Sequence, residues 1–240
     1  MLRYPTLSRL SRYAEDQWGL LTRRQAENAG VSQATLTRLV AEGILERVGH
    51  GVYHLAGAPI PDHAELRAAW LQLAPGVPAW EHTPEQGVVS YRSAAALYEL
   101  GHLSADRHEF TLPTRRQSRQ ADVRIHVRPV AEGESITLMG LPVTRPSRIA
   151  ADLLEDKEDP GAVAAVIADA IRAVKDYPDT FAQTLAPQAV RHGFRRNDGL
   201  AVLRWLLEMV GDPETPTWLN EARGRLTDSG ANDPRGGVAG

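Results

Sequence analysis

Residues 19–55 constrain the fold of this chain more than any other segment, because they predict two short helices and a β-hairpin in immediate succession. Thr22 and Ser32 stand where hydroxyl side chains cap helix N-termini, and Gly30 supplies the turn between the two helices. The glycine-rich triplet at 49–51 predicts a tight turn between two strands. This succession is typical of a winged helix-turn-helix, whose second helix can enter the major groove of DNA.

The second expected helix is amphipathic. Leu36, Leu39 and Val40 recur at the spacing that places them on one buried face, which leaves polar residues such as Gln33 and Arg38 on the other faces. Two interpretations stay open at this point. The motif is either a DNA-binding winged helix or a winged helix that contacts only other proteins, and the added wing favours DNA.

Composition and charge narrow the class of protein. The chain has 240 residues, a net charge of −3 and no cysteine, and its sequence contains no apolar run long enough for a membrane span. The first residues lack the apolar core of a signal peptide. Residues 1–57 hold seven arginines and five acidic residues, whereas the rest of the chain is acidic. We therefore expect a cytoplasmic protein without a membrane partner, which touches DNA with its N-terminal part.

Proline and glycine divide the chain into segments. Pro59 and Pro61 interrupt both helix and strand after the wing, and Asp62 with Glu65 then predicts a capping box at the start of a bridging helix. The predicted segments are a winged helix-turn-helix DNA-binding domain (1–57), a linker with the bridging helix (58–87), an α+β domain (88–226) and a disordered tail (227–240).

The fold class expected for the whole chain is α+β. The winged helix-turn-helix is followed by a small mixed or antiparallel sheet and a helical C-terminal third. Pro146 is placed to begin a helix directly after the sheet, and residues from 159 onward follow a helical pattern. The strand candidates are residues 109–112, 123–127, 135–139 and 141–144.

Two separated segments together resemble a known family. The motif AGVSQATLTRLVAEGILERVGHGVY at 29–53 is similar to the N-terminal domain of AbiE-type antitoxins of type IV toxin–antitoxin (abortive infection) systems. The motifs VVSYRSAAALYELG at 88–101, EFTLP at 109–113 and LPVTRPSRIAADLL at 141–154 resemble the domain that follows in those proteins. The resemblance extends over about residues 8–155.

The resemblance implies an AbiEi-like antitoxin that represses its own promoter by binding inverted repeats in double-stranded DNA. It further implies that the protein counteracts a nucleotidyltransferase-like toxin, with or without direct contact. Ser32, Gln33, Thr35, Thr37 and Arg38 would then face DNA from the recognition helix, Arg47, His50 and Tyr53 from the wing, and Arg23 and Arg24 from the preceding helix.

Other functional interpretations remain at this stage. A second basic surface, for nucleic acid or an acidic partner, would be formed by Arg115, Arg116, Arg119, Arg124, Arg128, Arg145 and Arg148, although alternating arginines are also typical of the solvated face of a sheet. The sequence shows no catalytic motif, so we expect no enzyme, no cofactor and no metal. The alternative function is a ligand-sensing winged-helix transcriptional regulator unrelated to a toxin.

Overall fold

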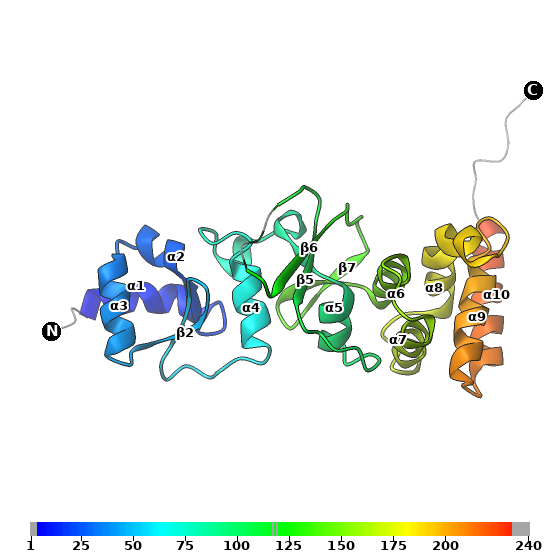
Figure 1. Ribbon diagram of the computed structural model, residues 1–240, viewed down its shortest axis with the longest axis horizontal. Coiled ribbons are helices and arrows are strands. Elements are labelled where there is room, and N and C mark those ends of the chain that lie inside the picture. Colours follow the sequence, from blue (N-terminus) through cyan, green and yellow to red (C-terminus); the bar gives the residue numbers. More distant parts are fainter. Residues whose placement is uncertain (1–3, 117, 119, 232–240) are drawn as a thin grey trace, which may run out of the picture. The chain divides into compact units, whose positions relative to one another are not determined.

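The computed structural model describes residues 4–116, 118 and 120–231 (Figure 1). The chain forms two compact units. Unit 1 comprises residues 1–89, 106–130 and 139–142, and unit 2 comprises residues 90–105, 131–138 and 143–240. The winged helix-turn-helix lies in unit 1, whereas the helices of the C-terminal third lie in unit 2.

Unit 1 begins with the predicted winged helix-turn-helix. Its helices are α1 (Tyr4–Glu15), α2 (Arg23–Asn28) and α3 (Gln33–Ala41), and its strands are β1 (Leu20–Thr22), β2 (Leu45–Gly49) and β3 (Val52–Leu55). The strands pair in the order β1-β3-β2, antiparallel throughout. The winged fold is therefore confirmed, with one strand, β1, added to the two that the sequence predicted.

The turn after the first helix contains two left-handed residues. Helix α1 ends at Glu15, and the backbone then turns left-handed at Trp18 (φ 59°) and Gly19 (φ 76°). A Cβ atom at Gly19 would meet Ala58 and the imidazole of His54, each at 2.9 Å. Glycine is thus required at this turn on two grounds, its backbone conformation and the closeness of its neighbours.

One hydrophobic cluster holds the three helices to the hairpin. It contains the inward residues of α3, Leu36 and Leu39, which are fully buried. The other buried members are Leu10, Ala14, Leu21, Ala26, Val31, Leu45 and Tyr53. Because every element of the motif contributes to this cluster, the orientation of α3 is set by the packing of the whole domain.

The N-terminus of α2 is closed by a capping box that also binds a distant loop. The Thr22 hydroxyl accepts a hydrogen bond from the Gln25 backbone N–H, and the Gln25 side chain accepts one from the Thr22 N–H. The same hydroxyl donates to the carbonyl of Pro75, and the Gln25 amide donates to the carbonyl of Val77. Thr22 and Gln25 therefore join the winged domain to the loop at residues 75–77.

Replacing Thr22 by valine is expected to lower the free energy of unfolding by about 1–2 kcal/mol, because a buried cap is lost at constant volume. Thr22→Ser keeps the hydroxyl and should cost much less. Urea unfolding of the two variants and the wild type measures the difference. Equal midpoints for Thr22→Val and the wild type would contradict this role.

The rest of unit 1 continues from the wing into a second sheet. It contains α4 (Ala64–Leu71), η1 (Ala79–Glu81), η2 (Pro84–Gln86), β4 (Val88–Val89), β5 (His108–Leu112) and β6 (Val123–Val127). The five strands of this sheet follow the order β6-β5-β4-β8-β7, where β7 is Ser135–Leu138 and β8 is Leu141–Thr144. β4 and β5 are antiparallel, whereas β5 and β6 are parallel, so the sheet is mixed.

The capping box predicted at Asp62 is wrong. The N-cap of α4 is His63, which adopts a left-handed backbone (φ 54°) and makes no side-chain cap bond. The Arg67 side chain, almost fully buried, donates to the Asp62 carbonyl at 2.8 Å and to the Met139 carbonyl at 2.9 Å. Its guanidinium also lies over the Trp18 ring at 4.2 Å. A buried arginine, rather than a capping box, thus organises the start of this helix.

Unit 2 is mostly helical, as expected. Its helices are α5 (Tyr91–Leu97), α6 (Pro146–Glu155), α7 (Pro160–Arg172), α8 (Pro178–Leu185), η3 (Ala186–His192), α9 (Gly199–Val210) and α10 (Thr215–Ala231). Pro146 begins α6, and the Asp159 and Asp198 carboxylates cap α7 and α9. None of the helices in the described residues is long and apolar enough to span a membrane.

The compact units differ in extent from the predicted segments. α4, which we expected to bridge two domains, lies within unit 1 together with three strands of the second sheet. α10 continues to Ala231, past residue 227, where we expected the tail to begin. Residues 232–240 of the predicted tail lie outside the described residues.

Tyr98, at the end of α5, carries a buried hydroxyl with no hydrogen-bond partner among the described residues. Burial, with the charge of Asp176, raises the pKa of this hydroxyl to about 12. Below pH ~10 this tyrosine is protonated in both the folded and unfolded states, so its ionisation does not lower the free energy of unfolding. Above pH ~10 the tyrosine ionises in the unfolded chain but not in the folded one. The free energy of unfolding therefore falls as the pH rises towards 12.

Tyr98→Phe is therefore expected to remove part of the alkaline loss of stability. Between pH 9 and 11.5 the unfolding free energy of the wild type should fall faster than that of the variant, by up to about 1.4 kcal/mol per pH unit. Near pH 7 the variant should be as stable as the wild type, because it loses only an unpaired hydroxyl. Parallel curves across this range would contradict the assignment.

Candidate nucleic-acid interface

Helix α3 presents one apolar and one polar face. Leu36 and Leu39 are 0% exposed, whereas Gln33, Thr37 and Arg38 are exposed to solvent. The Ser32 hydroxyl caps the helix by accepting from the Thr35 N–H at 3.2 Å. The polar face therefore stands on a rigid base, with Gln33 in the first turn of α3 and Arg38 in its last turn.

The hydroxyl groups of this face form hydrogen bonds within the helix and its N-cap. The Ser32 and Thr35 hydroxyls lie 3.0 Å apart, and the Thr37 hydroxyl donates to the Gln33 carbonyl at 3.0 Å. The two long side chains, Gln33 and Arg38, reach beyond them and carry the hydrogen-bonding groups that distinguish bases. The guanidinium of Arg38 lies 3.8 Å from the Glu42 carboxylate, an exposed and weak ion pair that DNA could replace.

Two further arginines stand at the N-terminus of α2. The Arg23 guanidinium donates to the Glu27 carboxylate at 2.7 Å, and Arg24 lies 3.6 Å from the same carboxylate. The hydrogen bond from Arg23 is the main reason why the pKa of Glu27 is lowered from its ordinary value. Both arginines are more than half exposed, so they remain accessible to a phosphate oxygen.

The wing is short, and its backbone contacts α4 and the residue after it. Arg47 donates to the carbonyl of Gly49 at 3.2 Å across an irregularity in the β2–β3 pairing, and His50 at the tip is exposed. A Cβ atom at Gly49 would meet Ala68 of α4 at 3.5 Å, and Gln72 donates to the Gly51 carbonyl at 3.2 Å. The backbone of the wing is thus held against α4 and the residue that follows it.

Tyr53 does not occupy the position that we expected. Its side chain is only 7% exposed and belongs to the hydrophobic cluster of the winged domain. Three successive residues of β3, Val52, Tyr53 and His54, are buried, and because successive side chains point to opposite faces, both faces of this strand are covered. Tyr53 is therefore a core residue rather than a DNA contact.

Comparison with known proteins agrees with this geometry. Residues 8–56 match the model of a family described as "Transcriptional regulator, AbiEi antitoxin". The N-terminal region is thus similar to the AbiEi antitoxin family. The matched residues include α2, α3 and the whole wing, so the match covers the winged domain.

A solved structure has a similar fold over most of this chain. The crystal structure of the RV2827C protein from Mycobacterium tuberculosis is similar over 89% of this chain and 80% of that chain, with a TM-score of 0.51 and 17% sequence identity. At this identity the likeness concerns the fold alone. No curated protein matches the sequence of this chain.

Outside the matched residues 8–56, the residues of the predicted second basic surface are divided between the two units. Arg115, Arg116, Arg124 and Arg128 lie in unit 1, Arg145 and Arg148 lie in unit 2, and Arg119 lies outside the described residues. Arg148 is largely buried and pairs with Glu134 at 2.5 Å and with Asp152 at 2.8 Å. Its charge is used inside unit 2, so it is not part of an exposed surface.

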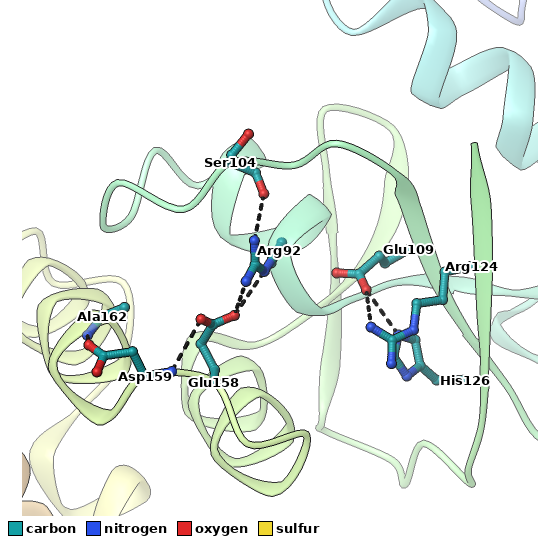
Figure 2. Close-up of polar contacts among 8 residues, drawn as sticks. All are labelled: Arg92, Ser104, Glu109, Arg124, His126, Glu158, Asp159 and Ala162. Carbon is teal, nitrogen blue, oxygen red and sulfur yellow. Dashed lines mark hydrogen bonds and ion pairs between the residues drawn. The ribbon is translucent and has the colours of Figure 1, made fainter. Parts of the chain in front are cut away.

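Several of these arginines have local partners. Figure 2 shows Arg124 and His126 of β6 pointing towards Glu109 of β5, at 3.5 and 3.2 Å, and this glutamate is almost completely buried. Arg116 donates to the Leu73 carbonyl. Arg124 therefore neutralises a buried carboxylate, and Arg116 provides a hydrogen bond to a loop carbonyl. These roles agree with the interpretation of a polar sheet face.

A comparable ion pair lies within unit 2. Arg92 donates to the Glu158 carboxylate at 2.8 and 2.5 Å and to the Ser104 carbonyl at 3.2 Å (Figure 2). This pair connects the start of α5 to the loop before α7. Among the described residues, no group of three or more histidine or acidic side chains is arranged to hold a metal ion.

The bracing of the wing by α4 could not be foreseen from the residues alone. Ala68 and Gln72 are responsible for it, and they touch the wing at Gly49 and Gly51. These contacts join segments about 20 residues apart. An alanine or a glutamine in a helix does not by itself predict a tertiary contact. The small residue at Gly49 is the only local signal, and it is equally typical of a hairpin turn.

Proposed function

We propose that this protein binds operator DNA through α3 and the wing, and represses its own promoter there. The observation that carries the proposal is the polar face of α3, where Gln33 and Arg38 are exposed above the fully buried Leu36 and Leu39. A glutamine can pair with adenine and an arginine with guanine, each through two hydrogen bonds. The match of residues 8–56 to a family of transcriptional regulators supports the same conclusion.

The phosphate contacts in this proposal come from arginines beside the recognition helix. Arg23 and Arg24 at the start of α2 and Arg47 on the wing are exposed, and all three lie in the same winged domain. Together with Arg38 they give about four cationic contacts per bound copy. The affinity should therefore fall with salt, with a log–log slope of roughly −3 to −4 per copy.

A reporter assay tests autorepression in the cell. The DNA upstream of the gene is fused to a reporter, and the full chain is supplied from a separate promoter. The wild type should lower reporter output, and Arg38→Ala should restore it at equal protein level. Arg204→Ala, an exposed arginine of α9, is the matched control and should repress like the wild type. Full reporter output with the wild type would contradict autorepression.

We further propose that the protein counteracts a nucleotidyltransferase-like toxin encoded beside it. This part of the proposal rests on the antitoxin family of residues 8–56. Expression of the neighbouring gene alone should arrest growth, and co-expression with this chain should restore it. A neighbouring gene that is harmless when expressed alone would contradict the proposal.

A further inference from the structure

Two glutamine side chains, Gln17 and Gln25, form a closed pair in the interior of unit 1. Both are 0% exposed, and each amide nitrogen donates to the oxygen of the other amide, at 2.7 and 3.1 Å. Each amide also donates once to, and accepts once from, the backbone, so all hydrogen-bonding positions of both amides are filled. Turning either amide over would place donor against donor, so the pair has a single arrangement.

The backbone groups that bind the pair come from two distant parts of unit 1. On the side of the winged domain, the pair donates to the Leu20 carbonyl at 2.8 Å and accepts from the Thr22 N–H at 2.9 Å. On the other side, it donates to the Val77 carbonyl at 2.9 Å and accepts from the Ala79 N–H at 3.1 Å. The N-terminus of α2 is therefore fastened to residues 75–79, which we call the support segment.

The support segment also contacts an arginine at the start of α2. A Cβ atom at Gly76 would meet the Cγ atom of Arg24 at 3.4 Å and the side-chain nitrogen of Asn28 at 3.8 Å. The Asn28 side chain donates to the Gly76 carbonyl at 3.4 Å. The stem of Arg24 thus lies against the support segment, whereas its side chain as a whole is 66% exposed.

The support segment is itself held in place by several contacts. The Val77 N–H donates to the Ala74 carbonyl at 2.9 Å, and a ring nitrogen of His82 lies 3.2 Å from the Val77 carbonyl. Trp80 follows the segment directly, and its ring stacks on that of Tyr13 in α1, with centroids 6.4 Å apart and planes 24° apart. A segment fixed in this way can set the position of the helix end that rests on it.

We propose that the glutamine pair is a positioning device for DNA binding. It holds the start of α2 on the support segment, so that Arg23 and Arg24 are already in place to meet DNA phosphate. An arginine whose stem is placed in advance loses less conformational freedom on binding. The glutamines are buried and would not touch DNA themselves. This inference rests on the proposed DNA-binding function, and it extends the DNA-binding unit past the matched residues 8–56 to residue 79.

The first measurement is the operator affinity of the full chain, at a temperature where thermal unfolding shows each variant to be folded. Gln25→Leu breaks the pair and its bond to Val77, and should weaken operator binding by about three- to tenfold. Gln188→Leu is the matched control. Gln188 is a buried glutamine of unit 2 that donates to the Ala151 carbonyl at 3.1 Å, so its loss should lower stability without changing operator affinity.

A double-mutant cycle shows whether Gln25 acts through the two arginines. Arg23→Ala/Arg24→Ala should weaken operator binding by about tenfold or more, because two charged hydrogen-bond donors are lost. Adding Gln25→Leu to this double variant should weaken binding by less than about twofold further. A merely structural role of Gln25 would instead give the same fold loss with and without the arginines.

Gly76→Leu tests the support segment while leaving the glutamine pair intact, and it decides the question if Gln25→Leu does not fold. The added side chain would meet the stem of Arg24, so operator binding should weaken at least about twofold. The effect should disappear when Arg24→Ala is also present.

Three results would overturn the inference. They are wild-type affinity in both Gln25→Leu and Gly76→Leu, equal losses with and without the two arginines, and unchanged affinity in Arg23→Ala/Arg24→Ala. An absence of operator binding by the wild type is distinguishable from these, because it would refute the proposed function and this inference with it.

Discussion

Arg38→Ala is expected to lower the affinity for operator DNA by roughly 5- to 150-fold, the range for losing one two-bonded contact to a base. Arg38 is exposed on α3, and its one ion pair in the described residues, with Glu42 at 3.8 Å, is too weak to hold it away from DNA. Fluorescence anisotropy with a labelled operator duplex and a scrambled duplex measures the change. The loss should be larger for the operator, because a base contact carries specificity.

Two controls separate recognition from folding and from bulk charge. Arg38→Ala should unfold at the same temperature as the wild type, since its side chain takes no part in the hydrophobic cluster. Arg204→Ala removes the same charge from α9 in unit 2 and should leave operator affinity unchanged. Wild-type affinity in Arg38→Ala, or an equal loss in both variants, would refute the assignment of α3 as the recognition helix.

Gly199→Ala is expected to destabilise unit 2 by about 3 kcal/mol or more, near the upper end for an overpacked core. A Cβ atom at Gly199 would lie 1.8 Å from the Ala182 carbonyl oxygen and 2.8 Å from the Ala186 nitrogen. Both are backbone atoms, so they cannot turn aside as a flexible side chain could. The start of α9 would have to move away from α8 and the turn that follows it. Urea unfolding should show this as a lower midpoint.

A second glycine in the same unit provides the matched control. Gly224 lies within α10, and nothing stands within 4 Å of the position that a Cβ atom would take there. Gly224→Ala should leave stability unchanged or raise it by about 0.5–1 kcal/mol, because alanine favours a helix. If Gly199→Ala and Gly224→Ala had equal midpoints, the close packing of α8 against α9 would be wrong.

Much of the winged domain could be predicted because its signals are local. Thr22 and Ser32 cap their helices through backbone groups three residues away, and the left-handed turn at Gly30 depends on its own backbone. Asp159 and Asp198 in unit 2 cap their helices in the same local way. Caps and turns of this kind need no tertiary contact, so the type of the capping or turn residue is enough to predict where a helix begins or ends.

The features that were missed or misassigned depend on distant contacts. Tyr53 was expected on the surface, but its neighbours in β3, Val52 and His54, are buried as well, so both faces of this strand are covered. The start of α4 departs from its expected capping box because Arg67 reaches both Asp62 and Met139. Pairing order and long-range side-chain contacts leave no periodic trace in a sequence, so only the structure could reveal them.

The central claim is that α3 and the wing recognise a specific DNA sequence, and footprinting of the region upstream of the gene tests it most directly. The full chain should protect inverted repeats, with half-sites about one helical turn apart or a multiple of it, at concentrations that leave flanking DNA open. Protection should disappear with Arg38→Ala and weaken as salt is raised. Uniform protection of all sequences, or none at any concentration, would contradict the account.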